Sequence, residues 1–130
     1  APPAPPPQCA PDNPIIETPT CAIACGIVIT PDAATTLCEG GIVDGIGNAW
    51  YGELPFKDGL PEKSNFDRYQ MIRMSEAPRE IDVHFVKNDI DPTGLGEPTL
   101  PPIFASVANA FYKAHGKRYF HQPFNSREPV

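Results

Sequence analysis

The apolar residues of the chain follow two different patterns in two separate segments. Residues 21–30, CAIACGIVIT, form an almost unbroken apolar run that is rich in β-branched side chains. Such a run is typical of a strand covered on both faces. Residues 81–86, IDVHFV, instead alternate between apolar and polar positions, which indicates a strand with one face in water. The pattern therefore predicts two strands that lie far apart in the sequence.

Two helices are predicted between and after these strands. Thr30, Pro31 and Asp32 supply a hydroxyl cap, a first-turn proline and an acid near the positive end of the helix dipole. We expect this helix to run to about Asn48. A second helix is predicted over residues 101–115, where proline opens a segment with apolar residues at helical spacing and a glycine closes it.

The first predicted helix is unusually rich in glycine, at Gly40, Gly41, Gly45 and Gly47. Each glycine inside a helix costs up to about 1 kcal/mol relative to alanine. We therefore expect another backbone or a ligand to approach this helix closely. Gly41 and Gly45 lie one turn apart and share a face.

The remaining segments predict short or irregular structure. Residues 49–54 and 59–62 are expected to pair as a hairpin around the turn at 55–58, and residues 64–74 to form a loop with some strand. Residues 89–102 are predicted to be a loop, residues 117–120 a short strand, and the tail after them irregular. The order of elements predicts an α+β fold, a small mixed sheet with two packed helices. The domain is expected to cover residues 21–130, after a proline-rich extended arm at residues 1–20.

Charge and cysteine spacing exclude several classes of function. The formal net charge is −6, and no basic stripe is present, which argues against binding to nucleic acid. No apolar run is long enough to cross a membrane. The four cysteines match no zinc or haem motif, so we expect buried thiols and at most one disulfide. No metal ligands are assigned within the chain.

One short motif indicates chemistry. In the segment from Thr93 to Pro98, TGLGEP, the carboxylate of Glu97 follows two glycines and precedes a proline. Glycine lets a ligand approach the backbone, and the proline restricts Glu97 to an extended conformation. A stiffly held carboxylate suits a general base. A turn with an exposed acid is the alternative interpretation of this pattern.

Seven segments in a fixed order extend this interpretation. They are ACGIVITPD (24–32), CEGGIVDGIG (38–47), YGELPFKDG (51–59), SNFDRYQMIRM (64–74), APREIDVHFV (77–86), GLGEPTLPPI (94–103) and VANAFYKAHGKR (107–118). Together they resemble the C-terminal part of the molybdenum-binding large or beta subunit of the xanthine oxidase family. Within that family they are most similar to the isoquinoline 1-oxidoreductase and aldehyde dehydrogenase type.

The resemblance implies a function, a cofactor and partners. It assigns Glu97 as the general base in the hydroxylation of an N-heterocycle or an aldehyde, with oxygen derived from water. It places Gly40, Gly41 and Gly96 near a molybdopterin cofactor, expected in its cytosine dinucleotide form. A larger molybdenum-binding chain is expected to hold most of that cofactor, and another subunit to carry 2Fe–2S clusters. The same resemblance favours the bacterial periplasm over the cytoplasm.

The sequence also departs from the family pattern. Leu37 occupies a position where the family usually has a glutamine that hydrogen-bonds the cofactor, and Ala24 and Thr30 replace the usual Asp and Asn of two signatures. A non-catalytic structural or assembly subunit that keeps the fold is therefore a second hypothesis. A free-standing secreted binding domain held by disulfides is a third.

Overall fold

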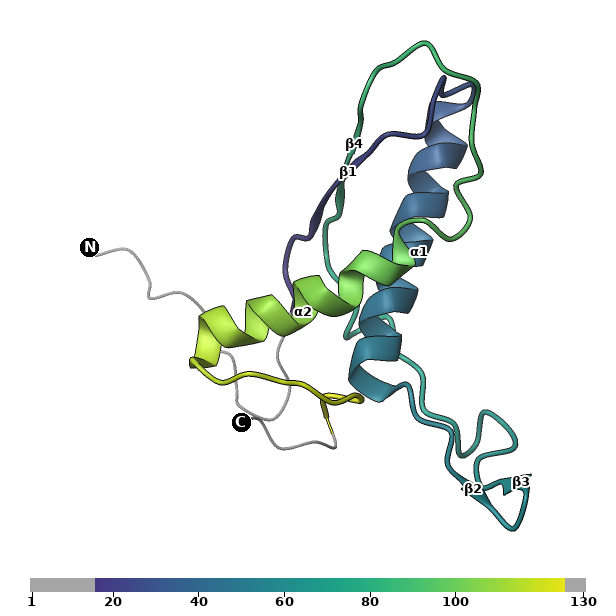
Figure 1. Cartoon of the computed structure of the whole chain (residues 1–130), viewed down its shortest axis with the longest axis vertical. Helices are drawn as coiled ribbons and strands as arrows, with labels where there is room; N and C mark the ends of the chain where they lie inside the picture. Colours follow the sequence, from purple (N-terminus) through teal and green to yellow (C-terminus); the bar gives the residue numbers. More distant parts are fainter. Residues whose placement is uncertain (1–15, 126–130) are drawn as a thin grey trace.

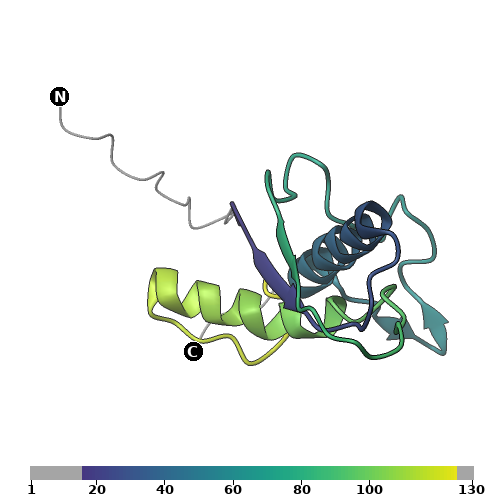
Figure 2. The same cartoon turned by 90° about the horizontal axis from the view of Figure 1, so that it is seen from above.

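The structure is a computed structural model, and it describes residues 16–125. Its elements follow the order β1 (Thr20–Ile23), α1 (Pro31–Tyr51), β2 (Phe56–Lys57), β3 (Leu60–Pro61), β4 (Asp82–Phe85) and α2 (Leu100–His115). The two helices cross, the β1–β4 pair lies beside them, and β2 and β3 project beyond the C-terminal end of α1 (Figure 1). Figure 2 shows the same arrangement from above. This mixture of helices and small sheets confirms the predicted α+β class.

Helix α1 begins at Pro31 as predicted, but two details differ. Thr30 is the N-cap residue, yet its side chain makes no capping hydrogen bond, so the predicted hydroxyl cap is wrong. Only its backbone carbonyl takes part, accepting from the Ala34 N–H at 3.0 Å. The helix also continues past Asn48 to Tyr51, because Ala49 and Tyr51 are buried and Trp50 packs against the core.

Helix α2 closely follows the predicted start and stop signals. Prolines 101 and 102 lie in its first turn, where the missing N–H groups would have no helical partner. Gly116 ends the helix in the left-handed conformation, with φ of 70°, and its N–H donates to the Tyr112 carbonyl at 2.8 Å.

Strands β1 and β4 pair in parallel, with Thr20 opposite Asp82 and Ile23 opposite Phe85. The predicted wet face of β4 is confirmed, because exposed and half-buried residues alternate along it. The same alternation on β1 means that the prediction of a strand covered on both faces is wrong. Only three residues of the apolar run, 21–23, are extended strand, because the chain turns at Gly26, which has a φ of 80°.

The predicted hairpin exists, but its strands lie closer to the turn than expected. Phe56 pairs with Pro61 and Lys57 with Leu60, so the strands include residues predicted to be the turn. Asp58 and Gly59 form the connection with φ of 51° and 79°, as expected of a tight two-residue hairpin turn. Residues 117–120 and 64–74 form no strand, so the short strand predicted in each of these segments is wrong.

The core lies where the two helices meet the C-terminal segment. Its buried members are Ile42, Ile46, Ala49, Val107, Phe111 and Phe124. The Phe124 N–H donates to the Ala49 carbonyl at 3.0 Å, which ties the C-terminal segment to the end of α1. Rings surround Phe111: Trp50 lies 5.1 Å away between centroids and Tyr119 5.4 Å.

The glycines of α1 allow this close packing. A methyl group added at Gly45 would come within 2.8 Å of the Ile103 Cβ in α2, and one at Gly47 within 2.8 Å of the Ile72 Cγ2. The predicted close approach is therefore confirmed at these positions, and the neighbour is protein. No helix within residues 16–125 is long and apolar enough to cross a membrane.

Candidate functional site

The candidate base, Glu97, lies on the loop that joins β4 to α2. This loop passes over the N-terminal end of α1 and then runs down its side to the start of α2 (Figure 1). The path brings residues of the loop against two other segments, the turn after β1 and the second and third turns of α1. Each of these segments holds the loop by hydrogen bonds.

The first anchor precedes Glu97 and joins Thr93 to Cys25. Both the backbone N–H and the hydroxyl of Thr93 donate to the Cys25 carbonyl, at 2.9 and 3.2 Å. Three residues before Thr93 on the same loop, the Ile90 carbonyl accepts a hydrogen bond from the Ile27 N–H at 3.1 Å. Gly26 is required here, because a Cβ at its positive φ would collide with the Asp91 carbonyl.

The second anchor follows Glu97 and joins Thr99 to α1. Thr99 is 2% exposed, and its hydroxyl donates to the carbonyl of Cys38 at 3.2 Å. Gly41 leaves the space that this contact needs, because a methyl group there would collide with the Thr99 Oγ1. A glycine of α1 and a threonine of the loop thus fit directly against one another.

Glu97 itself is exposed between the two anchors. Its carbonyl accepts from the Leu100 N–H at 3.0 Å, which closes the turn that starts α2. Gly94 and Gly96 have open space around them, with no atom within 4 Å of an added methyl group. An exposed carboxylate is therefore presented from a loop that is hydrogen-bonded to the rest of the chain on both sides of it.

An apolar groove runs beside this loop. Leu95, two residues before Glu97, forms part of its wall, and Leu37 faces it from α1. The other lining residues are Cys25, Ile27, Val28, Ile29, Thr30, Ala33, Ala34, Pro92 and Thr93. Because this lining is mostly hydrocarbon, the groove offers few hydrogen-bond donors for a polar cofactor.

Few side chains of this chain are available to bind a metal ion or a cofactor. Within residues 16–125, no group of three histidine, cysteine or acidic side chains could bind a metal ion, and no buried side-chain polar atom lacks a partner. The chain can offer a molybdenum cofactor the Glu97 carboxylate and the open backbone at Gly94 and Gly96. These residues lie on an open surface of the chain and do not enclose a cofactor.

The other predicted cofactor residues lie in different surroundings. Gly40 is exposed, and no atom lies within 4 Å of an added methyl group, whereas Gly41 is buried against Thr99. Gly96 is exposed beside Glu97. The structure therefore places Gly41 against the loop that carries Glu97, whereas Gly40 does not contact this loop. Contact of Gly40, Gly41 or Gly96 with a cofactor stays a prediction. Leu37 is 48% exposed.

Sequence reasoning missed the two threonines that hold the loop. Thr93 and Thr99 flank the Gly-x-Gly-Glu-Pro segment symmetrically, which was the available signal. Their acceptors could not be found in this way, because backbone carbonyls of Cys25 and Cys38 carry no sequence signature. The described cysteines, Cys21, Cys25 and Cys38, are free thiols, so no disulfide forms among them.

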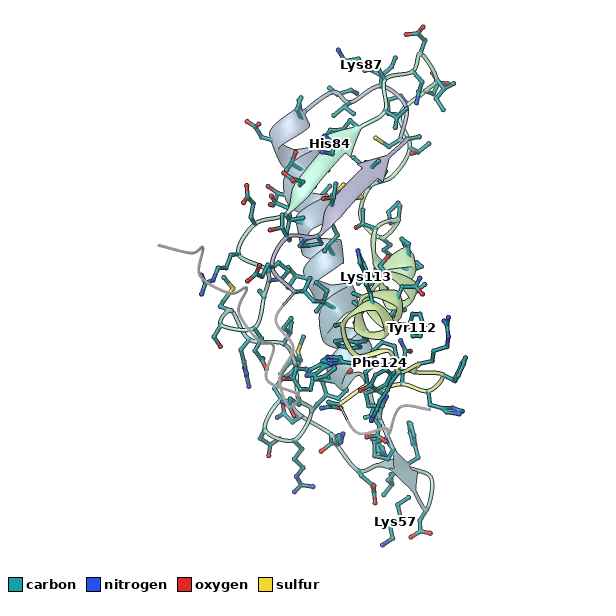
Figure 3. All side chains as sticks on the ribbon, turned by 90° about the vertical axis from the view of Figure 1, so that its left-hand side faces the viewer. Lys57, His84, Lys87, Tyr112, Lys113 and Phe124 are labelled. Carbon is teal, nitrogen blue, oxygen red and sulfur yellow. The ribbon has the colours of Figure 1, made fainter. Side chains whose placement is uncertain are left out.

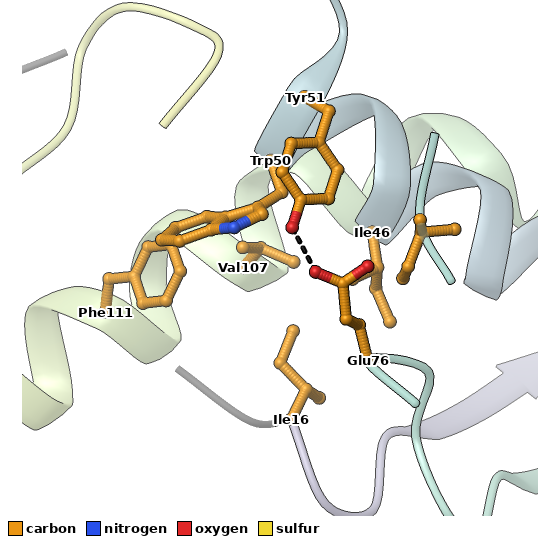
Figure 4. Close-up of a pocket in the computed structure, with 8 residues that line it drawn as sticks. Ile16, Ile46, Trp50, Tyr51, Glu76, Val107 and Phe111 are labelled. Atoms are coloured by element: carbon orange, nitrogen blue, oxygen red, sulfur yellow. Dashed lines mark hydrogen bonds between the residues drawn. The ribbon is translucent and has the colours of Figure 1, made fainter. Parts of the chain in front are cut away.

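A small apolar pocket lies at the other end of α1 (Figure 4). The Tyr51 hydroxyl donates to the Glu76 carboxylate, whose other oxygen accepts from the Arg73 N–H at 2.8 Å. Burial, together with the Glu76 hydrogen bond and charge, raises the pKa of Tyr51 to about 12. Trp50 and Ile16 complete the walls, leaving room for about one water molecule. The pair therefore fastens the segment around residue 76 to α1.

The basic and imidazole side chains labelled in Figure 3 lie on separate elements. His84 lies exposed on β4, Lys87 beyond its end, and Lys57 on the hairpin at the opposite end of the molecule (Figure 3). His115 and Lys113 occupy the last turn of α2, where a cation is favourable, as predicted for His115.

Comparison with solved structures defines the class of fold. The chain superposes on quinoline 2-oxidoreductase from Pseudomonas putida 86 with a TM-score of 0.68 at 19% identity, covering 80% of this chain and 14% of that one. It superposes on the Cu,Mo-CO dehydrogenase with a TM-score of 0.64 at 18% identity, covering 75% and 13%. The fold is that of a domain found in molybdenum enzymes.

Sequence comparison gives the family. The model of the molybdopterin cofactor-binding domain matches residues 15–78, which include β1, α1 and the hairpin. The beta subunit of isoquinoline 1-oxidoreductase from Brevundimonas diminuta is 35% identical over 97 residues, 75% of this chain and 12% of that protein. A membrane-bound aldehyde dehydrogenase (pyrroloquinoline-quinone) from Gluconacetobacter polyoxogenes is 30% identical over 104 residues, 80% of this chain and 13% of that protein. The chain therefore belongs to the xanthine oxidase family, as a molybdopterin cofactor-binding domain.

Two limits follow from these matches. The chain spans only 12–13% of the length of the two relatives. The segment matched by the family model ends at residue 78, so Glu97 lies beyond it, on the loop that joins β4 to α2.

Proposed function

We propose that this chain is the part of a molybdenum hydroxylase that supplies the general base, Glu97. Its substrate would be an N-heterocycle or an aldehyde, the two classes that appear in the names of its relatives. The observation that carries the proposal is the exposed carboxylate on a loop fastened at both ends to the rest of the domain. General bases contribute about 10²- to 10⁴-fold to a rate when they are held in position.

The molybdenum cofactor, when bound, would supply the electron-accepting centre and acidify the water-derived oxygen nucleophile. The residues of this chain would accept the proton and leave space for the cofactor and substrate. Glu97 takes up a proton at its carboxylate, and the open backbone at Gly94 and Gly96 leaves the cofactor and substrate room to approach. The cytosine dinucleotide form of the cofactor and 2Fe–2S clusters on another subunit belong to the same proposal.

A larger molybdenum-binding chain is the proposed partner. Several apolar side chains around the loop end of the molecule are about half exposed or more, including Ile27, Ile29, Val86 and Ile90. Contiguous exposed apolar surface marks a protein interface. Because the relatives are about eight times longer than the matched segment, we assign this surface to the remainder of the family's molybdenum subunit.

The test is performed on the complex purified with its larger partner chain. Glu97→Gln keeps the size and polarity of the side chain and removes its basicity, so we expect molybdenum content to stay unchanged and turnover to fall about 10²-fold or more. Glu62→Gln, at an exposed glutamate of the hairpin segment, is the matched control and should keep the full rate. A Glu97→Gln complex with full molybdenum and full rate contradicts the proposal.

A non-catalytic assembly role is the second candidate. Leu37 favours it, because its hydrocarbon side chain cannot make the hydrogen bond that the family pattern places at this position. A native complex that contains no molybdenum would support this candidate over the first.

A further inference from the structure

We propose that Thr99 is a positioning residue for Glu97, acting through a hydrogen bond to α1. The inference rests on the proposed function of Glu97 and adds the part of the domain that fixes its orientation. Thr99 touches neither cofactor nor substrate in this scheme. It acts on the segment that carries the base.

The geometry of Thr99 differs from that of the rest of the loop. It is the N-cap residue of α2 and is 2% exposed, whereas residues 96–98 before it are exposed. Its side chain makes no capping bond to α2 and instead donates to the Cys38 carbonyl of α1 at 3.2 Å. A threonine at an N-cap position normally satisfies its own helix. Here its hydroxyl holds a second element.

The acceptor of this bond belongs to a rigid part of the molecule. Cys38 is fully buried on α1, three residues before Gly41. Gly41 leaves the space that the hydroxyl occupies, because a Cβ at position 41 would collide with the Thr99 Oγ1. The position of residue 99 is therefore fixed by the packing of α1.

One residue, Pro98, separates this fixed point from Glu97, and a hydrogen-bonded turn spans residues 97–100. The Leu100 N–H donates to the Glu97 carbonyl at 3.0 Å, and Pro98 limits the backbone of Glu97 to extended conformations. On the other side, Thr93 is held by Cys25, but Gly94 and Gly96 intervene and have freedom of rotation. The orientation of Glu97 is therefore set mainly from the Thr99 side.

The experiment uses the complex with the larger chain and compares four variants. Thr99→Val keeps the shape of the side chain and removes the hydroxyl; Thr99→Ser keeps the hydroxyl. Thr36→Val is the matched control, because the Thr36 hydroxyl also donates to a carbonyl, that of Asp32 at 3.0 Å, on an exposed part of α1. Thr99→Ala is included because it removes the hydroxyl without any demand for space.

We expect Thr99→Val and Thr99→Ala to lower kcat about tenfold or more with little change in KM, since small misplacements of a catalytic group cost up to about 10²-fold. Molybdenum content should be unchanged. Hydrogen exchange of the Leu100 amide, which donates to the Glu97 carbonyl at 3.0 Å, should be about tenfold faster in both variants, which reports the turn at Glu97 independently of turnover. Thr99→Ser and Thr36→Val should match the wild type in both measurements.

The outcomes separate the inference from the proposed function. Wild-type kcat and wild-type exchange in Thr99→Val and Thr99→Ala, with Glu97→Gln inactive, would overturn the role of Thr99 alone. A loss in Thr99→Ser as large as in Thr99→Val would also overturn it, because the hydroxyl would then not be the cause. If exchange quickens in Thr99→Val while Glu97→Gln keeps its full rate, the tether stands and the assignment of Glu97 as base fails.

Discussion

Gly45 of α1 lies against Ile103 of α2 with no space between them. A methyl group at position 45 would come within 2.8 Å of the Ile103 Cβ and 3.0 Å of the Leu100 carbonyl oxygen. The missing side chain is what lets the two helices touch at their crossing point. The same contact sets where α2 starts relative to α1, and so where the Glu97 loop must end.

This contact predicts a destabilising glycine substitution. Gly45→Ala should lower the free energy of unfolding by about 1–3 kcal/mol, because overpacking forces backbone and side chains apart. In the double variant Gly45→Ala, Ile103→Ala, the cost should be smaller than the sum of the single costs, since Ile103→Ala removes the Cγ2 atom that would lie 3.1 Å from a methyl group at position 45. Urea denaturation of the four proteins in this cycle measures the coupling. Strict additivity would contradict the contact.

Adjacent glycines in α1 should respond in opposite directions. Gly40→Ala meets no atom within 4 Å, so it should stabilise the chain by about 0.5–1 kcal/mol through helix propensity. Gly41→Ala forces the Thr99 hydroxyl away from Cys38 and should destabilise it by about 1–3 kcal/mol. Thermal unfolding of both variants decides the matter. Equal effects of the same sign would show that residue 41 is not packed against the loop.

The Tyr51–Glu76 pair predicts an alkaline loss of stability. The folded-state pKa of Tyr51 is about 12, above its ordinary value of 10, so the neutral phenol is favoured by folding. Its contribution is fully present below pH 10 and is lost as the pH rises from 10 to 12, by about 3 kcal/mol in total. Tyr51→Phe should remove this part of the decline.

Denaturation at a series of pH values compares Tyr51→Phe with Tyr112→Phe, a change at an exposed tyrosine of α2. The Tyr112 variant should retain the wild-type decline between pH 10 and 12. An alkaline limb in Tyr51→Phe as steep as that of the wild type would contradict the role of the buried pair.

Cys38 should react much more slowly with an alkylating reagent in the folded chain than in the unfolded chain. Cys38 is fully buried, and desolvation, followed by the neighbouring Cys21, Cys25 and Glu39, raises its pKa; burial also raises that of Cys21. Because the thiolate is the reactive form, Cys38 should be alkylated about tenfold or more slowly in the folded chain than in urea. Peptide mass spectrometry after timed iodoacetamide treatment gives the rates. Equal labelling of Cys38 under both conditions would mean that it is not enclosed.

Local signals in the sequence were enough to predict the two helices, β4, the hairpin and the family. The residues at 30–32 and around 101 and 116 were enough to locate both helices, because proline and glycine restrict the backbone through its own geometry. The alternation in IDVHFV was enough for β4, and the Lys-Asp-Gly turn for the existence of a hairpin. The ordered segments also pointed to the family, which the comparisons confirmed.

Only the tertiary structure decided which surfaces meet. The apolar run at 21–30 predicted a strand covered on both faces, but the positive φ of Gly26 turns the chain after Ile23, and nothing within residues 16–125 covers the outer face of β1. The glycines of α1 look alike in sequence, yet Gly41 accommodates a threonine 58 positions later and Gly40 nothing at all. The loop that carries Glu97 is likewise held by the backbone carbonyls of Cys25 and Cys38. Because every residue has a backbone carbonyl, the sequence does not mark these two as acceptors. Contacts of this kind depend on where distant segments pack, and a linear pattern of residue types carries no record of that.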